Sequence, residues 1–208
     1  MENLSKVVYE AQGFDEKVFL EHLKEREIIL NTVVDDMIIE TCIMQILRIN
    51  KEDENIIPEK RKPIKIYINT NGGDIDVGLV LCNVIQQSLT PVYTIALGKA
   101  YSMGGLVLIA GHKRFAYEFT SILIHDGSLG IGGSTKKVKE TMNFYNEMED
   151  RIKKFILDNT KYTEELYDDK YGSEFFMYAK QAKELGIIDY IIGEKSDVVE
   201  LVDLQKYE

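Results

Sequence analysis

The chain is poor in the residues that metal sites and disulfides use. Its 208 residues include only two cysteines and three histidines. His22, His112 and His125 lie far apart and lack the paired spacing of zinc ligands, so no metal site is expected. Cys42 and Cys82 fall inside apolar helical patterns, which favours buried free thiols over a disulfide.

Long apolar runs and clustered positive charge are lacking as well. No stretch approaches the roughly 18 consecutive apolar residues of a membrane span. The segment 1–17 has neither the basic nor the apolar region of a secretory signal. The formal net charge of −10 disfavours binding to nucleic-acid phosphates. We therefore expect a cytoplasmic protein that binds neither membranes nor nucleic acid.

The chain contains enough apolar sequence for one catalytic domain, because 45% of its residues are hydrophobic. Its central part alternates strands with helices. Strands are expected at 64–68 and from Pro91 to Gly98, and helices at 74–87 and 102–110. This βαβ rhythm predicts an α/β fold with a mostly parallel sheet.

Further elements are expected on both sides of this centre. The expected helices are 16–24, one from Asp35, about 134–158 and 179–185, and the expected strands are 27–30, 113–117, 120–125 and 187–192. The polar segment 50–63 is expected to be a surface loop. The helix from Asp35 is expected to face the core with one stripe of side chains. That stripe consists of Met37, Ile38, Cys42, Ile46 and Leu47.

Ser102 stands where a strand ends and a helix begins, in the sequence GKAYSMGG. A serine at such a turn projects toward substrate, its small neighbours leave room, and the next helical turn supplies free N–H donors. These are the surroundings of a nucleophile. Serine is also a common helix cap, so capping alone would explain the residue equally well.

Two other turns could complete a site around Ser102. Gly72 and Gly73 lie at a strand-to-helix turn, where the backbone can aim N–H groups at a developing oxyanion, although glycine pairs are common in ordinary turns. His125 follows an apolar strand, at the carboxyl end where open α/β sheets gather their sites. A lone histidine is often structural, but next to an exposed serine it is the natural general base.

A histidine base is usually oriented by a carboxylate, and the sequence offers several. Three of them lie in YDDKYGSEFF, between the long helix and the last one. They are Asp168, Asp169 and Glu174.

These motifs together resemble the Clp protease proteolytic subunit family. INTNGG, GKAYSMGG and LIH are similar to that family's INSPGG, G-x-A-A-S-M-G and M-I-H, and FMYAKQAKELGIID is similar to its closing segment. The resemblance runs from about Leu20 to Ile192 with the motifs in order. It implies a crotonase-like fold with repeated βαβ units and a protruding handle helix at about 134–158.

The resemblance also implies roles for the turn residues. Ser102 would be the nucleophile of a serine endopeptidase and His125 its base, with the N–H groups of Gly73 and Met103 as the oxyanion hole. An extended substrate backbone would pair with the glycine-rich segment. Its residues are Gly127, Leu129, Gly130, Ile131 and Gly132.

At the family's acid position this chain has glutamate, Glu174, in place of aspartate, and Asp169 and Asp168 remain rivals. Asn71 replaces the family's proline before the two glycines, and no proline follows His125. These differences indicate a divergent member of the family.

For partners, the resemblance implies unfolded polypeptides delivered by a separate hexameric Clp unfoldase, since the sequence has no G-x-x-x-x-G-K-[ST] phosphate loop. The chain would assemble into seven-membered rings, stacked as a tetradecamer through the handle helix. No cofactor is required. Residues 1–19 would form an axial pore region, 20–193 the peptidase domain and 194–208 a charged tail.

Two other functions are compatible with the sequence. The change to Glu174 would suit a catalytically weak or inactive ring subunit with a structural role. A crotonase-fold enzyme acting on acyl-CoA would share the βαβ rhythm and the glycine-built oxyanion hole, but would not need a serine and a histidine in these turns. The long helix could also be an ordinary core or coiled-coil helix.

Overall fold

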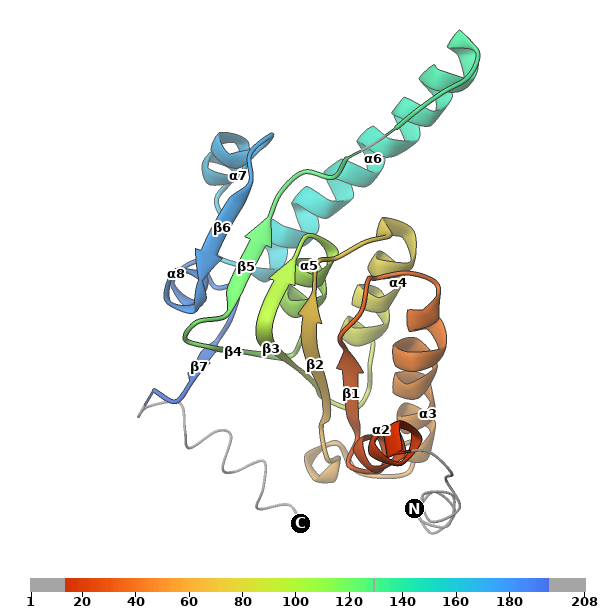
Figure 1. Cartoon of the computed structure of the whole chain (residues 1–208), viewed down its shortest axis with the longest axis vertical. Helices are drawn as coiled ribbons and strands as arrows, with labels where there is room; N and C mark the ends of the chain where they lie inside the picture. Colours follow the sequence, from red (N-terminus) through yellow and green to blue (C-terminus); the bar gives the residue numbers. More distant parts are fainter. Residues whose placement is uncertain (1–13, 129, 195–208) are drawn as a thin grey trace.

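A computed structural model of the chain describes residues 14–128 and 130–194 (Figure 1). Within these residues seven strands form one sheet. They are β1 (Glu27–Leu30), β2 (Ile64–Thr70), β3 (Val92–Tyr101), β4 (Lys113–Tyr117), β5 (Ser121–Ile124), β6 (Phe175–Tyr178) and β7 (Tyr190–Ile192).

The sheet is mostly parallel, as the βαβ rhythm predicted. Its main path is β1-β2-β3-β4-β7, and β5 branches from β3 and carries β6 on its other edge. All pairs on the main path and the β3–β5 pair are parallel, whereas β5 and β6 are antiparallel. Strand β2 alternates fully buried isoleucines, Ile64, Ile66 and Ile68, with half-buried residues, which is the pattern of a central strand.

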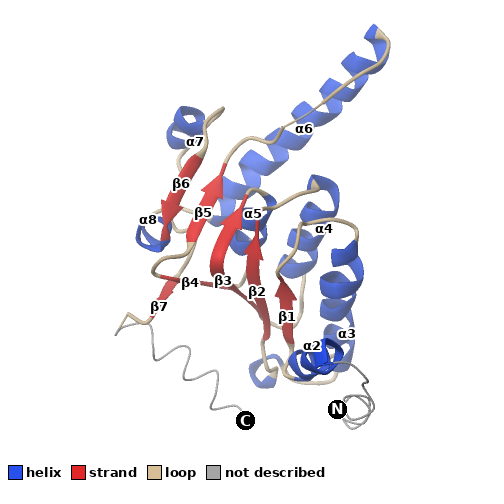
Figure 2. Ribbon diagram, viewed as in Figure 1, coloured by secondary structure: helices blue, strands red, loops and turns tan. Residues whose placement is uncertain are grey.

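The helices flank this sheet (Figure 2). They are α2 (Phe14–Lys24), the π-helix η1 (Ile39–Ile43), α3 (Met44–Glu52), the 3₁₀-helix η2 (Pro58–Lys60), α4 (Ile75–Gln86), α5 (Met103–Ile109), α6 (Thr135–Asn159), α7 (Glu164–Lys170) and α8 (Ala179–Glu184). The short α5 is buried along its whole length and packs against β3 and α4, so it fixes the turn that precedes it.

The helix expected from Asp35 forms, but its buried face differs from the expected stripe. Ile38, Cys42 and Ile46 are buried, whereas Met37 is 61% exposed and Leu47 is 47% exposed. The π-helix η1 adds about one residue to its turn and thereby rotates the faces before and after it relative to a regular 3.6-residue repeat. The prediction that Met37 and Leu47 face the core was therefore wrong.

Three other expectations also need correction. Strand β3 continues past Gly98, because residues 99–101 pair with 121–123 of β5. The segment 50–63 is only partly a loop, since α3 continues to Glu52 and η2 interrupts the rest. Helix α7 and strand β6 were not expected at all.

The long helix α6 forms almost where it was expected and projects from the body of the molecule (Figure 1). Its N-terminus is capped by Ser134, whose side chain accepts a hydrogen bond from the Lys137 N–H. Its buried residues, Met148 and Ile156, both lie in its second half. The projecting half is not an ordinary core helix.

Both cysteines are free and buried, as the sequence predicted. Burial raises the pKa of the Cys42 thiol to about 11 and that of Cys82 to about 12. Among the helices in the described ranges, none combines the length and the apolar character needed to cross a bilayer. The expected pore region and charged tail fall mainly on 1–13 and 195–208, which lie outside the described residues.

Candidate active site

Ser102 occupies a sharp turn between β3 and α5. Its backbone has φ 54° and ψ −122°, and apart from Arg26 it is the only described non-glycine residue with positive φ. Such a conformation costs roughly 1–3 kcal/mol and persists only where the surroundings impose it. Here the surroundings are β5, whose Leu123 carbonyl accepts a hydrogen bond from the Ser102 N–H at 3.0 Å, and the buried helix α5.

The side chain of Ser102 does not cap α5. A capping serine has extended backbone angles and bonds an N–H two or three residues ahead, as Ser134 does for α6. Ser102 has neither feature. The strained turn instead matches the geometry that exposes a nucleophile between a strand and a helix.

Gly72 lies directly against this serine turn. A Cβ atom at Gly72 would sit 2.8 Å from the Ser102 Cβ and 2.9 Å from the Met103 nitrogen. With φ of 90°, the residue is also in the region that favours glycine. The β2–α4 turn and the β3–α5 turn can therefore meet only because position 72 has no side chain.

Gly73 is fixed from its other side. A Cβ atom there would lie 2.2 Å from the Val34 carbonyl oxygen, and Val34 bonds the two residues that flank Gly73. In such a parallel bridge the N–H of the central residue points away from its partner. Within the described residues the N–H groups of Gly73 and Met103 both lack a hydrogen-bond acceptor.

His125 immediately follows β5 and is hydrogen-bonded to Glu174. The distance between His125 Nδ1 and Glu174 Oε1 is 2.9 Å. The sheet register explains this contact, because Leu123 pairs with Phe176 and Ile124 with Phe175, so the next antiparallel position sets His125 opposite Glu174. With a proton on Nδ1 donated to the carboxylate, the Nε2 lone pair of His125 is left as a proton acceptor.

The other two candidate acids contact lysines. Asp168 Oδ1 lies 2.7 Å from Lys153 Nζ of α6, and Asp169 Oδ2 lies 2.6 Å from Lys170 Nζ. The structure thus brings Glu174 to His125, and it does not bring Asp168 or Asp169 there. The Glu174 side chain is 60% exposed, whereas that of His125 is 21% exposed.

Ser102 and His125 leave neighbouring strands at the same edge, since Tyr101 of β3 pairs with Leu123 of β5. No hydrogen bond joins the Ser102 hydroxyl to His125 among the described residues. Contacts between a nucleophile and its base are often long without substrate and tighten when it binds. The described residues thus place a serine hydroxyl, an imidazole bonded to a carboxylate and two N–H groups without acceptors at one end of the sheet.

A small pocket beside His125 was missed by the sequence reasoning. It is lined by Ile124, His125, Asp126, Tyr162, Tyr167, Lys170 and Tyr171. Burial raises the pKa of Tyr167 to about 12, and a hydrogen bond to Glu149 of α6 raises the pKa of Tyr171. Only the unpredicted α7 gathers these tyrosines, and their spacing in sequence gave no signal of it.

The glycine-rich segment leaves β5 and leads to the tip of α6 (Figure 1). Gly127, Gly130 and Gly132 are exposed, and the positions where Gly130 and Gly132 would carry side chains are open. Ile131 is half-buried. Leu129, also expected to bind substrate, lies outside the described residues.

Comparison with protein families identifies a family that matches this chain. The model of a family described as Clp protease matches residues 12–195, which is most of the chain. The match covers the serine turn, the glycine turn, the His125 strand and the Glu174 strand.

Proposed function

Since the chain belongs to the Clp protease family, we propose that it is a serine endopeptidase in which Ser102 is the nucleophile, His125 the general base and Glu174 the orienting acid. The observation that carries this proposal is the strained, non-capping turn at Ser102 beside an imidazole that is hydrogen-bonded to a carboxylate. Helix caps and structural histidines do not require this combination. The family match favours this activity over acyl-CoA chemistry.

The proposed reaction is acyl transfer to Ser102 and then to water. The Ser102 hydroxyl attacks the peptide carbonyl carbon while His125 Nε2 takes its proton, and the N–H groups of Gly73 and Met103 stabilise the oxyanion. The imidazolium then protonates the leaving amine as the C–N bond breaks. In the second half, water attacks the acyl carbonyl carbon as His125 Nε2 takes its proton, and the imidazolium returns that proton to the Ser102 oxygen as the acyl C–O bond breaks and the acid product leaves.

The substrate proposed is an extended peptide or unfolded polypeptide. Gly127 and Gly130 follow His125 in the chain and are exposed, and no atom of the described residues, chain neighbours aside, lies within 4 Å of the side-chain position of Gly130. A substrate strand can pair with such a segment through main-chain hydrogen bonds, as in other complexes formed by strand addition. Folded substrates would need a separate ATP-driven unfoldase of the Clp type.

We further propose that the projecting half of α6 joins copies of the chain, as two stacked seven-membered rings. Met142 and Phe144 of this half are 40% and 59% exposed. Exposed apolar side chains on a helix that leaves the body favour association. Mass photometry of the wild type and of Phe144→Glu tests this point, and an assembly that stays intact in Phe144→Glu would contradict it.

The peptidase itself is tested with a fluorophosphonate probe and a fluorogenic short peptide. Ser102→Ala should lose all labelling, and His125→Ala should lower the labelling rate by about 10⁴-fold or more. His22→Gln, which removes a histidine from a distant surface, serves as the control and should match the wild type. Labelling that persists in Ser102→Ala would overturn the assignment of the nucleophile.

A second candidate, a ring subunit without activity, is favoured by two observations. The Ser102 hydroxyl forms no hydrogen bond with His125 in the described residues, and the Glu174 side chain is 60% exposed. A wild-type protein that assembles into rings but neither labels nor cleaves would establish this alternative.

A further inference from the structure

A row of three side chains lies next to the His125–Glu174 pair, one step further into the sheet. Tyr101 pairs with Leu123, and Leu123 pairs with Phe176, so the row crosses β3, β5 and β6. Residues in register on adjacent strands point to the same face. Leu123 is only 5% exposed although it lies outside the main core cluster, as expected if the two rings cover it.

The two aromatic rings of this row contact each other. Tyr101 and Phe176 have ring centroids 5.5 Å apart and an interplanar angle of 83°, an edge-to-face arrangement. The Tyr101 hydroxyl also forms a hydrogen bond with the Ser121 hydroxyl, one row further along β5. Tyr101 is therefore fixed at both its ring and its hydroxyl, immediately before Ser102.

Strand β6 depends on such contacts because it is short and lies at an edge. It has four residues and, among the strands of the described residues, pairs only with β5. Glu174 immediately precedes β6. The Glu174 side chain is long and 60% exposed, so holding it in one position costs the conformational entropy of several rotatable bonds. Any displacement of β6 moves the Glu174 carboxylate relative to His125.

We propose that Tyr101 and Phe176 form a positioning pair that holds β6 against β3, so that the Glu174 carboxylate stays on His125 Nδ1. Neither residue is assigned a contact with substrate, and both act through the position of Glu174. The expected effect on catalysis rests on the proposed peptidase function, whereas the expected effect on the His125–Glu174 contact is independent of that function.

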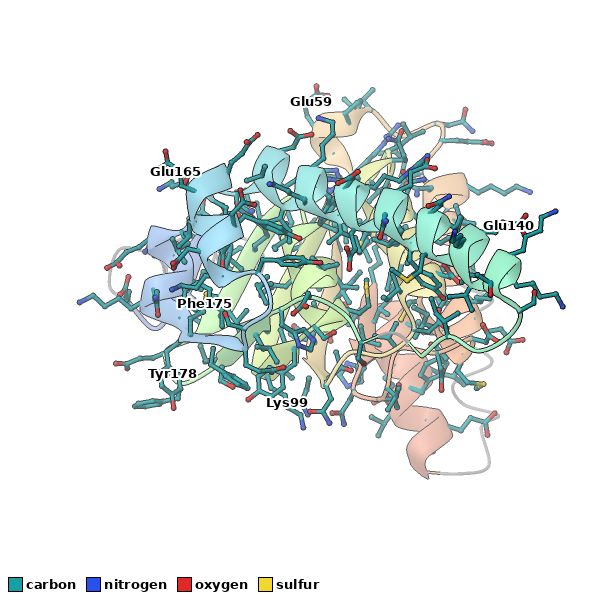
Figure 3. The ribbon with its side chains drawn as sticks, turned by 90° about the horizontal axis from the view of Figure 1, so that it is seen from above. Glu59, Lys99, Glu140, Glu165, Phe175 and Tyr178 are labelled. Carbon is teal, nitrogen blue, oxygen red and sulfur yellow. The ribbon has the colours of Figure 1, made fainter. Side chains whose placement is uncertain are left out.

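Phe176→Leu tests the pair because it removes the ring and keeps an apolar residue. Phe176→Tyr keeps the ring and should retain the wild-type contact between Glu174 and His125. Position 176 is 53% exposed, so the added hydroxyl can point into water. The control is Tyr178→Leu on the same strand and face, one row further from Glu174. Figure 3 shows Tyr178 and Lys99 on the side of the molecule away from α6.

The first readout needs no activity. Diethyl pyrocarbonate modifies exposed imidazoles, and mass spectrometry at fixed pH gives the rate at His125 with His22 as an internal reference. In the wild type only Nε2 of His125 is free to react; release from Glu174 frees Nδ1 as a second reactive nitrogen and lets the ring turn, so Phe176→Leu should raise the His125 rate several-fold, with Phe176→Tyr and Tyr178→Leu like the wild type. Equal rates in Phe176→Leu and the wild type would overturn the inference.

The second readout is kinetic. Phe176→Leu should lower kcat by roughly three- to tenfold, the range that the loss of one edge-to-face aromatic pair gives, with KM unchanged. In a Glu174→Gln background the same change should have almost no further effect, because the pair acts through Glu174. An equal loss in both backgrounds would contradict the proposal.

The two hypotheses fail separately. A wild type that reacts with no fluorophosphonate would refute the peptidase, while faster modification of His125 in Phe176→Leu would still support the positioning pair. An active wild type whose His125 is unaffected by Phe176→Leu would refute the pair alone.

Discussion

His125 Nδ1 donates a hydrogen bond to Glu174 Oε1 at 2.9 Å, although the two residues are 49 positions apart in sequence. The two residues meet because β5 and β6 are antiparallel and in a register that continues beyond the last strand residues. Glutamate has one methylene more than aspartate. It reaches the imidazole from a largely exposed position.

Replacing Glu174 should therefore damage catalysis more than replacing either rival acid. Glu174→Gln keeps the size but removes the charge that stabilises the imidazolium, so kcat should fall by roughly 10²–10⁴-fold. Asp168→Asn and Asp169→Asn, which remove carboxylates bound to lysines, should stay near the wild-type rate. Steady-state cleavage of a fluorogenic peptide by all three variants decides the assignment.

Two results would contradict this prediction. A loss in Asp169→Asn larger than in Glu174→Gln would move the acid to Asp169. Unchanged kcat in Glu174→Gln would mean that His125 needs no carboxylate here.

Three of the site's turns could be predicted because each carries a local signal. Ser102 and Gly73 follow apolar strands and precede helices, and His125 follows an apolar strand. The spacing of apolar residues and the residues that end each strand are therefore enough to predict these turns. The contact of Glu174 with His125 has no local signal. It depends on the pairing of β6, whose four residues are too few to show a period, and only the family resemblance indicated it.

The π-helix η1 was beyond prediction for another reason. The apolar residues around it fit a regular 3.6-residue repeat about as well as they fit the true faces. Met37 and Leu47 could therefore be placed on the core side. The extra residue in the π turn becomes visible only when the helix packs on β1 and α4.

Gly73→Ala should remove one of the two N–H donors of the proposed oxyanion hole, because it moves the backbone at position 73. The new Cβ would lie 2.2 Å from the Val34 carbonyl, so the turn must shift. Loss of one oxyanion donor lowers rates by roughly 10²–10³-fold, and the fluorophosphonate labelling rate should fall by that amount. Gly193→Ala is the matched control.

Gly193 also has positive φ, 100°, but within residues 14–128 and 130–194 no atom beyond its chain neighbours lies within 4 Å of its side-chain position. Its alanine variant should lose about 1–2 kcal/mol of stability at most and no labelling. If both variants label at the wild-type rate, Gly73 does not form the oxyanion hole.

The buried ion pair of Arg26 and Asp53 should make stability depend on pH. Asp53 is fully buried and accepts two hydrogen bonds from Arg26 and one from Thr90, all at 2.7 Å. Burial alone would raise the Asp53 pKa, but these bonds outweigh it and hold the pKa below its ordinary value. A lowered pKa stabilises the fold above the unfolded value of about 3.9, and this stabilisation is lost as pH falls through the folded value.

Asp53→Asn should thus lower the free energy of unfolding by about 3 kcal/mol at pH 7, because it leaves Arg26 without its charge partner. The difference from the wild type should shrink as the pH falls below about 4. Urea unfolding at fixed protein concentration measures both values, with Asp169→Asn as an exposed control. A difference that is the same at both pH values would contradict the charged state of Asp53.

Tyr162→Phe should leave the fold unchanged in stability or raise it. The Tyr162 hydroxyl is buried and has no hydrogen-bond partner within the described residues, while its ring packs edge-on against Phe175. A buried unpaired polar group costs roughly 1–3 kcal/mol, so its removal is favourable if the ring stays. Thermal unfolding of Tyr162→Phe and of Tyr162→Leu, which loses the ring, separates the contribution of the hydroxyl from that of the ring. A lower Tm for Tyr162→Phe than for the wild type would show that the hydroxyl has a partner.

The two cysteines should be inert in the folded protein and reactive only after unfolding. Cys42 lies in η1 and Cys82 in α4, both buried, and burial raises their thiol pKa values to about 11 and about 12. A thiol must ionise to react, so at pH 8 at most about one Cys42 in a thousand is in the reactive form, even before access is considered.

Reaction with dithiobis(nitrobenzoate) at pH 8 should therefore follow the rate of unfolding, and it should become fast in urea. Cys42→Ser and Cys82→Ser assign each thiol. Rapid reaction of Cys42 alone in native buffer would mean that η1 opens while the sheet stays folded, since the irregular π turn is where that helix is least regularly hydrogen-bonded. Rapid reaction of both thiols would contradict the packing of η1 and α4 against the core.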